Sequence, residues 1–197
     1  MDNTVGSRQR DIIFGMLLGD GFLERNGKYV RLVTDHSGKQ ETYVNWLASQ
    51  LTNLNPKLVF KKRIDRRNLK VYDHCILRTN TSSKLEKFFS LFYEGKRKRI
   101  PPCLSKIISP MVLAVWIMDD GYKRNDCRAM RINTQSYTLE EQKIIRQSFL
   151  RIGIKVNIHK QKQHYLVYIP SSYMKKFIGM IKPYIIPSME YKICLTP

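Results

Sequence analysis

Two stretches of the chain are almost entirely apolar, and each ends at an aspartate followed by a glycine. The first reads "IFGMLLGDGF" from residue 13, and the second reads "LAVWIMDDGY" from residue 113. They align without a gap, so that their last aspartates and glycines coincide and an aromatic residue follows each glycine. Because a helix that is apolar on every side is buried on every side, the pattern predicts two buried helices, over 11–20 and 111–120.

Asp20 and Asp120 end these predicted helices, and Gly21 and Gly121 follow them as residues typical of helix stops. A carboxylate there meets the negative end of the helix dipole, at a cost of about 0.3–1 kcal/mol. A structural role gives no reason to accept this cost twice, whereas a divalent cation would neutralise both carboxylates and polarise phosphate oxygens. We therefore predict that the two helices pack on each other along a pseudo-twofold axis and hold a metal site at their ends.

The patterns after the two aspartates match as well. Each copy continues with a polar turn ("ERNGK" or "KRNDC"), a strand-like run, an amphipathic helix, two more strand-like runs and a final helix. Thr138 and Glu141 have the spacing of a capping box before the second amphipathic helix. The chain therefore predicts an α+β fold of two αββαββα repeats with antiparallel sheets, the first over 8–98 and the second over 111–197, joined by a proline- and charge-rich linker over 99–110.

The strand-like runs alternate between apolar and polar side chains. In "KLVFKKRID", Leu58, Phe60 and Ile64 share one face, whereas Lys61 and Arg63 lie on the other. We expect the apolar faces to pack against the helices, and the basic, amide- and aromatic-bearing faces to form a saddle that reads DNA. A solvated outer face is the alternative, but these positions contain few acids. The residues predicted to contact DNA are Arg31, Lys61, Arg63, Lys70, Tyr72, His74, Arg78, Arg131, Asn133, Lys155, Asn157, His159 and Lys162.

The charge of the chain favours the same partner. Lys and Arg number 35 against 16 acidic residues, which gives a formal net charge of +19. Self-repulsion of this size opposes the compact state, so a polyanion such as nucleic acid is the expected partner. A solvated basic surface, or a protein of the ribosomal type, is the alternative.

Signals for other classes of protein are absent or weak. No apolar run approaches the ~20 residues that span a bilayer. The first residues, "MDNTVGSRQRDI", lack a secretory signal and contain early acids, unlike an organellar transit peptide, so we expect an intracellular protein that acts where it is translated. The four cysteines lie far apart and predict reduced thiols rather than a zinc site. The four histidines predict surface or DNA-facing residues.

The paired motifs resemble those of LAGLIDADG homing endonucleases in their single-chain, two-repeat form. "IFGMLLGDG" and "LAVWIMDDG" fill the nine motif positions, and "KRIP", "MRINTQSYTLEE" and "IKPYIIPSMEYK" are similar to segments of monomeric mitochondrial group I intron endonucleases. Nearly the whole chain takes part in the resemblance. It departs from the family where Val115 replaces the glycine found at Gly15, and where Leu18 and Met118 stand at the sixth motif position, which is an acid in the family pattern.

The resemblance implies the roles of individual residues. The last acid of each motif, Asp20 or Asp120, is a metal ligand, and the residue before it, Gly19 or Asp119, offers a backbone carbonyl. Asp119 is expected to contribute mainly through that carbonyl. By match to "KRIP" and "MEYK", Lys98 and Lys192 assist near the scissile phosphate, although phosphate attraction without catalysis is the alternative for each. The implied cofactor is Mg²⁺ or Mn²⁺.

The implied function is metal-dependent hydrolysis of both strands of a long, asymmetric double-stranded DNA site by a monomer, in the service of intron mobility. The family cuts across the minor groove and leaves short 3′ overhangs. An RNA-binding splicing maturase on the same fold is the first alternative, and host intron RNA would then be a partner. A non-catalytic, sequence-specific DNA-binding protein is the second. The compartment stays open between a mitochondrion, a chloroplast and a bacterial or archaeal cytoplasm.

Overall fold

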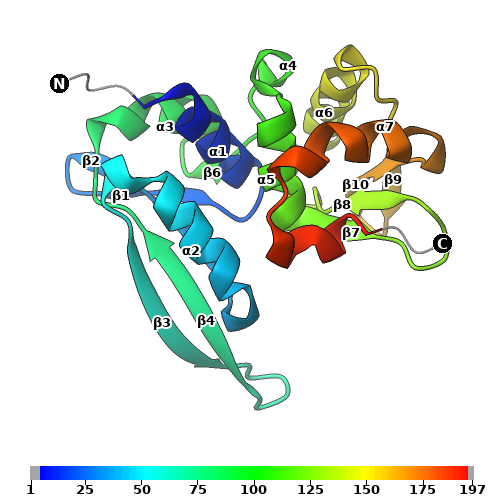
Figure 1. The fold of residues 1–197 in the computed structure, drawn as a ribbon. Helices are drawn as coiled ribbons and strands as arrows, with labels where there is room; N and C mark the ends of the chain where they lie inside the picture. The colour runs from blue at the N-terminus through cyan, green and yellow to red at the C-terminus, as the bar shows by residue number, and fades with distance from the viewer. Residues whose placement is uncertain (1–4, 195–197) are drawn as a thin grey trace. The chain divides into compact units, whose positions relative to one another are not determined.

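The computed structural model describes residues 5–194, and the chain divides into two compact units between Leu91 and Phe92 (Figure 1). Each unit contains a four-stranded antiparallel sheet with helices packed on it. Both sheets have the same topology: the first strand pairs with the second, the second with the fourth and the fourth with the third. The predicted α+β fold with a repeated sheet is therefore confirmed, whereas the repeat boundaries and the linker stay a prediction.

The first unit is built around the sheet β1-β2-β4-β3. Three short 3-10 turns connect its elements: η1 (Gly38–Gln40), η2 (Thr52–Leu54) and η3 (Ser83–Leu85). The elements are α1 (Ser7–Leu18), β1 (Phe22–Asn26), β2 (Tyr29–Ser37), α2 (Glu41–Gln50), β3 (Lys57–Ile64), β4 (Val71–Arg78) and α3 (Glu86–Phe92), which crosses the boundary between the units.

The second unit is built around the sheet β7-β8-β10-β9 and begins with the two-stranded hairpin β5-β6. Its elements are β5 (Tyr93–Glu94), β6 (Arg97–Lys98), α4 (Leu104–Ile107), α5 (Pro110–Asp120), β7 (Gly121–Lys123), β8 (Met130–Ile132), α6 (Leu139–Arg151), β9 (Asn157–Gln161), β10 (His164–Ile169), α7 (Ser171–Ile181), η4 (Lys182–Tyr184) and η5 (Pro187–Lys192). The hairpin and α4 were not expected from the sequence. Helix α4 lies within the predicted linker and packs on α6.

The two motif helices are buried, as their composition predicts. All nine residues from Met111 to Asp119 in α5 are buried, and so are Ile12, Ile13 and Leu17 in α1. Within the second unit, α5 packs against α7, η4, η5 and β7. The packing of α1 on α5 stays a prediction.

The boundaries of α1 and β1 differ from the prediction. Helix α1 ends at Leu18 because the backbone of Gly19 (φ −97°, ψ −133°) leaves the helical region, although its N–H still bonds to the carbonyls of Gly15 and Met16 at 3.1 Å. The predicted polar turn "ERNGK" is mostly strand, and only Gly27 (φ 67°) and one further residue form the hairpin turn. Asp20 therefore lies two residues beyond its helix, whereas Asp120 is the last residue of α5.

The capping box of α6 is confirmed. The hydroxyl of Thr138 accepts a hydrogen bond from the backbone N–H of Glu141 at 3.3 Å, and the Glu141 carboxylate accepts one from the Thr138 N–H at 2.7 Å. None of the described helices is long and apolar enough to cross a membrane.

Candidate metal centre and nucleic-acid interface

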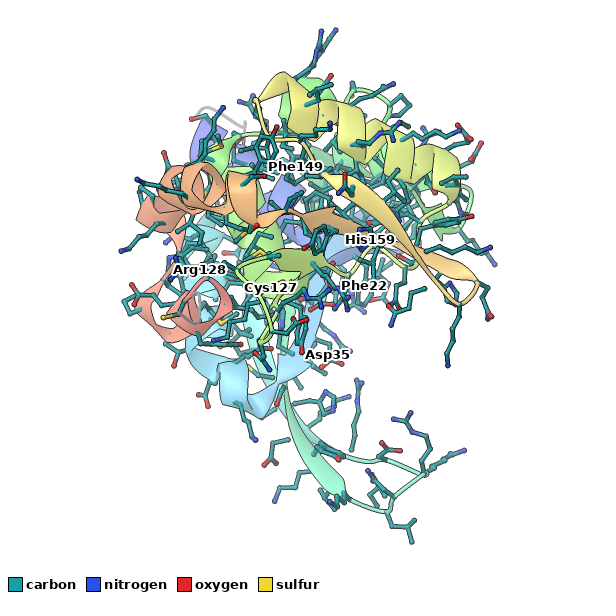
Figure 2. The ribbon with its side chains drawn as sticks, turned by 90° about the vertical axis from the view of Figure 1, so that its right-hand side faces the viewer. Phe22, Asp35, Cys127, Arg128, Phe149 and His159 are labelled. Atoms are coloured by element: carbon teal, nitrogen blue, oxygen red, sulfur yellow. The ribbon has the colours of Figure 1, made fainter. Side chains whose placement is uncertain are left out.

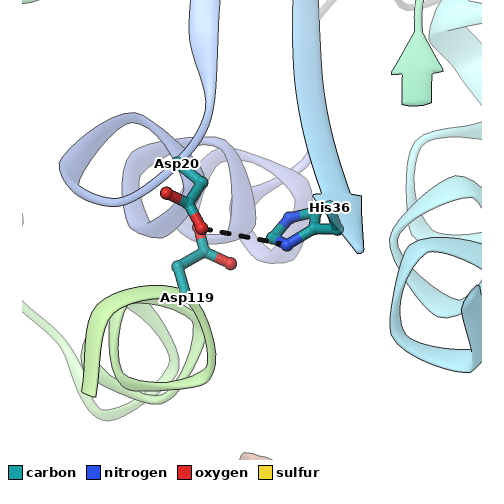
Figure 3. Close-up of side chains that lie close together, drawn as sticks. All are labelled: Asp20, His36 and Asp119. Atoms are coloured by element: carbon teal, nitrogen blue, oxygen red, sulfur yellow. Dashed lines mark ion pairs between the residues drawn. The ribbon is translucent and has the colours of Figure 1, made fainter. Parts of the chain in front are cut away.

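The carboxylate of Asp20 stands at the point where α1 gives way to β1, and its side chain is 47% exposed. Oδ2 of Asp20 lies 3.8 Å from Nδ1 of His36 on β2 (Figure 3). His36 is buried, and its Nε2 lies 2.9 Å from the hydroxyl of Thr34. The prediction that all four histidines face the surface or DNA is wrong for His36, because strand alternation turns it to the helix side of the sheet together with Thr34.

A glycine is required after each motif aspartate because strand and helix approach each other closely there. A Cβ atom at Gly21 would lie 2.7 Å from the carbonyl oxygen of Met16, and one at Gly121 would lie 2.5 Å from that of Ile117. Gly121 has φ −69°, so it is not the left-handed helix stop that its position suggests. Because of this close approach, the chain passes from each aspartate directly into the first strand of the sheet. Each carboxylate therefore lies at the start of the polar face of its sheet.

The second unit presents Asp120 at the end of α5 as a partly exposed side chain. Its backbone carbonyl accepts a hydrogen bond from the N–H of Asn133 at 3.1 Å, which ties the helix end to the sheet. Burial raises the pKa of Tyr137, and the negative charges of Asp120 and Glu141 raise it further. Tyr137 is thus a neutral, buried hydroxyl in the field of Asp120, and no pattern in the sequence points to it.

Lys192 reaches the end of the same helix. Its Nζ donates to the carbonyl oxygens of Asp119 and Gly121, at 3.0 Å each. A cation at a helix C-terminus is favourable because the free carbonyls are there. The structure therefore brings Lys192 to the predicted carbonyl of Asp119, which is itself a buried residue. Lys98 lies in the hairpin β5-β6, opposite Tyr93, and its predicted role stays a prediction.

The oxygen donors at the two helix ends suit a hard divalent cation. The predicted ligands are the carboxylates of Asp20 and Asp120 and the carbonyls of Gly19 and Asp119, and Mg²⁺ and Mn²⁺ prefer carboxylate, carbonyl and water oxygens. These donors therefore fit the predicted ion, although the ligand set stays a prediction.

The polar face of the first sheet contains the residues that alternation predicts. Lys61 pairs with His74 and Arg63 with Tyr72 across β3 and β4, so these four side chains share one face. Arg31 and Arg78 are partly buried, and Lys70 lies exposed just before β4. The sequence prediction missed Asp35 on this face. Its carboxylate accepts from Nδ1 of His74 at 2.8 Å and from Arg63 at 2.7 Å.

The polar face of the second sheet has a continuous row of side chains across its four strands. Tyr122, Arg131, Tyr168 and Asn157 are successive register partners from β7 to β9. His159, labelled in Figure 2, stacks on Tyr168 with ring centroids 4.4 Å apart. Burial lowers the pKa of His159 and the charges of Arg131 and Arg124 lower it further, so the imidazole is neutral at neutral pH. Asn133, Lys155 and Lys162 are exposed.

Two exposed aromatic residues, Phe22 and Tyr122, were not among the predicted DNA contacts. Phe22 is 39% exposed and Tyr122 is 53% exposed, each as the first or second residue of the strand that follows its motif. The signal was present, because an aromatic residue follows each motif glycine.

Two arginines on the polar faces have a buried donor that no protein group accepts. Nε of Arg78 and Nε of Arg131 are buried and have no hydrogen-bond partner among the described residues. Buried polar groups are nearly always hydrogen-bonded. Nε of Arg99 and Nε1 of Trp116 are likewise buried without a partner among the described residues, so such donors do not by themselves mark DNA contacts.

Comparison with known proteins agrees with this geometry. A sequence model of the LAGLIDADG DNA endonuclease family matches residues 10–177. The chain is 31% identical over 194 residues to a Debaryomyces hansenii protein named cytochrome b mRNA maturase bI2, covering 93% of this chain and 72% of the relative. It is 27% identical to the DNA endonuclease I-ChuI of Chlamydomonas applanata, over 96% of each. The fold matches the homing endonuclease I-WcaI bound to its DNA recognition sequence, with a TM-score of 0.91, 23% identity and coverage of 98% of this chain and 89% of that one.

Proposed function

The chain belongs to the LAGLIDADG DNA endonuclease family, and from this premise we propose that it makes a double-strand break in a long, asymmetric DNA site. The observation that carries the proposal is the repetition of one arrangement in both units. In each, an aspartate at the end of an apolar motif helix leads directly into a sheet whose polar face contains Arg, Lys, His and Tyr side chains. Two such halves in one chain supply one carboxylate for each DNA strand, without a second copy of the protein.

The cofactor of the proposed reaction is a divalent cation, Mg²⁺ or Mn²⁺. Asp20 and Asp120 would hold it with their carboxylates, and Gly19 and Asp119 with their carbonyls. When bound, the ion neutralises negative charge at the phosphate and activates water. Lys192, fixed at the carbonyls of Asp119 and Gly121, places a positive charge beside this site. We propose that it offsets charge developing on the scissile phosphate or orients the attacking water, with Lys98 in the equivalent role for the other strand.

The two polar faces would position the DNA. Arg and Lys side chains there can address guanine and phosphate, and Asn157 can address adenine. The orientation of the units that this binding requires, with α1 packed on α5, belongs to the proposal.

Cleavage of a plasmid that carries the intron-less insertion locus, in the presence of Mg²⁺, tests this function. We expect Asp20→Asn and Asp120→Asn each to lower double-strand cleavage by about 100-fold or more, because each removes the charge that holds the cation. The matched control is Glu140→Gln, which also removes one acid but at an exposed position of α6 paired with Lys143. If the aspartate variants cleave as fast as the control, the proposal is wrong. Chelator-resistant binding without cleavage by the unaltered protein would favour the DNA-binding alternative.

RNA is a second partner that we propose, on one specific observation. The relative that is 31% identical over most of this chain is named an mRNA maturase. Because that relative is named for cytochrome b mRNA, we place the action of this protein in a mitochondrion. A splicing assay on host intron RNA, with and without the protein, separates this role from cleavage. We expect Asp20→Asn to abolish cleavage and to leave any effect on splicing unchanged.

A further inference from the structure

The first strand of each sheet carries an exposed aromatic side chain two residues after the motif aspartate. Phe22 on β1, labelled in Figure 2, is 39% exposed, and Tyr122 on β7 is 53% exposed. Because each residue of extended chain spans at most ~3.6 Å, the Cα atom that carries each ring lies within roughly 7 Å of the aspartate Cα atom. Each ring therefore belongs to the immediate surroundings of a predicted metal ligand.

The two rings occupy equivalent places in their sheets. Strand register places each ring at one end of a row of side chains that crosses the sheet on its polar face. The rows are Phe22, Val33, Arg78 and Lys57 in the first unit, and Tyr122, Arg131, Tyr168 and Asn157 in the second. Directly paired residues of neighbouring strands point to the same face of a sheet. Both rings therefore share a face with predicted DNA contacts, which are Arg78 in the first row and Arg131 and Asn157 in the second.

Exposure alone would not single out these rings, because scattered exposed apolar residues are normal on protein surfaces. Phe60 and Ile64 are 58% and 64% exposed on the helix side of β3, where the expectation that helices cover the apolar face is wrong. Phe22 and Tyr122 differ from these residues because they recur at one place in two units. The other members of the two rows differ in chemical type between the units, whereas the first is aromatic in both. This repetition ties the ring to a task that the units share.

The neighbouring aspartate determines which part of the DNA the ring meets. In the proposed reaction, each aspartate holds a cation at the scissile phosphate. One nucleotide advances about 3.4 Å along the axis of duplex DNA, so a ring about 7 Å away falls on a nucleotide one or two positions from that phosphate. Phe22 has no polar side-chain atom, and its favourable partners are the apolar surfaces of the sugar and the base step. Apolar side chains that press on a base step unstack and bend the duplex.

We infer that Phe22 and Tyr122 press on the nucleotides beside the two scissile phosphates and hold the DNA in a deformed conformation that can be cleaved. The inference rests on the proposed nuclease function and names two residues that position its substrate. Deformation costs less at flexible base steps such as TA than in stiff tracts. The rings would therefore select the base pairs next to the cleavage sites without hydrogen bonds to them.

The first test compares Phe22→Ala and Tyr122→Ala with the unaltered protein on a plasmid that carries the target. We expect each variant to slow the cleavage of one strand by about 5- to 100-fold, the range that an aromatic contact with a base supplies. Nicked plasmid should therefore accumulate, because the other unit still cuts its strand. Tyr122→Phe keeps the ring and should cleave within about twofold of the unaltered protein.

The matched controls are Leu139→Ala and Leu150→Ala, which remove apolar side chains of 37% and 61% exposure from α6. Both should cleave as the unaltered protein does. A thermal midpoint for each variant, measured without DNA, shows that the alanine variants fold.

The second test separates deformation from simple affinity. Energy transfer between dyes at the two ends of the target measures the DNA bend in EDTA, where no cleavage is needed. We expect both alanine variants to bend the bound DNA less. A target with a mismatched, and hence flexible, base pair beside the cleavage site should restore cleavage by Phe22→Ala to within about fivefold, because such DNA deforms at little cost.

Three results would overturn the inference. They are an unchanged bend in both alanine variants, strand cleavage as fast as in the leucine controls, and an equal loss of cleavage on the mismatched target. Each leaves the proposed nuclease intact, provided that Asp20→Asn still lowers cleavage. If instead the unaltered protein bends the target and cleaves no DNA, the proposed function fails, and the bend measurement still decides whether the rings deform the DNA.

Discussion

Asp35 is, with Glu24, one of two acids that the strands of the first sheet place on its polar face. Its carboxylate holds the imidazole of His74 and the guanidinium of Arg63 at 2.8 and 2.7 Å. A negative charge there opposes DNA phosphate, so its benefit is the orientation of two predicted DNA contacts. We expect Asp35→Asn to raise affinity for unrelated DNA by about two- to fivefold, because one repulsive charge is lost. We expect it to lower discrimination against substituted target sites by about 5- to 100-fold, because a well-placed contact gives that much selectivity.

The measurement for Asp35 is the ratio of the dissociation constants for target DNA and for target DNA with single base-pair substitutions. Asp65→Asn is the matched control, since it removes an acid from the same hairpin at a residue paired only locally, with Arg67. Both variants should bind unrelated DNA more tightly, but only Asp35→Asn should change the ratio. An unchanged ratio in Asp35→Asn would show that the carboxylate does not orient the contacts.

Helix α6 depends on Glu141 for more than its capping box. The carboxylate also accepts from the N–H of Ile100 at 3.1 Å and pairs with Arg97. Burial would raise the pKa of Glu141, but the hydrogen bonds from Thr138 and Ile100 and the charge of Arg97 outweigh burial, and the pKa is lowered. We expect Glu141→Gln to lower the free energy of unfolding by about 1–3 kcal/mol at neutral pH.

The lowered pKa of Glu141 determines how this loss in unfolding free energy depends on pH. Because the folded protein has the lower pKa, the charged form of Glu141 contributes its full stabilisation above the ordinary carboxyl value of about 4.3, and the contribution is lost as the pH falls through the lower folded value. The urea midpoints of the unaltered protein and of Glu141→Gln should therefore differ by a constant amount from pH 7 down to about pH 5. Below about pH 4 the two midpoints should converge. Glu140→Gln, at an exposed position, should follow the unaltered protein throughout.

At the scale of elements, the sequence predicts what depends on periodicity and local chemistry. The apolar helices, the capping box at Thr138 and the alternation along β3 are properties of neighbouring residues, and the structure shows all of them. The exposure of Phe60 (58%) and Ile64 (64%) on the apolar side of β3 was not predictable, because alternation tells which face is apolar but not how far a helix extends over it. Asp35 was missed because its partners, Arg63 and His74, lie on other strands far away in sequence, and the field of Asp120 at Tyr137 likewise depends on the fold.

For the whole molecule, the net charge of +19 predicts that the affinity for DNA depends strongly on salt concentration. Each phosphate neutralised by Lys or Arg releases counterions and contributes about −0.9 to the slope of log K against log salt. Eight of the predicted DNA contacts are cations: Arg31, Lys61, Arg63, Lys70, Arg78, Arg131, Lys155 and Lys162. If each neutralises one phosphate, the slope for target DNA is roughly −7.

Two single variants separate specific phosphate contact from diffuse attraction. Lys155→Ala removes an exposed cation from the predicted interface and should make the slope shallower by about 0.9. Lys175→Ala removes a cation that is also exposed, but on α7, and should leave the slope unchanged. Equal changes in both would show that the charge of the molecule acts as a whole. A change confined to Lys155 would instead show that the polar face of the second sheet contacts the DNA backbone, which is the arrangement that gives each motif aspartate access to a phosphate.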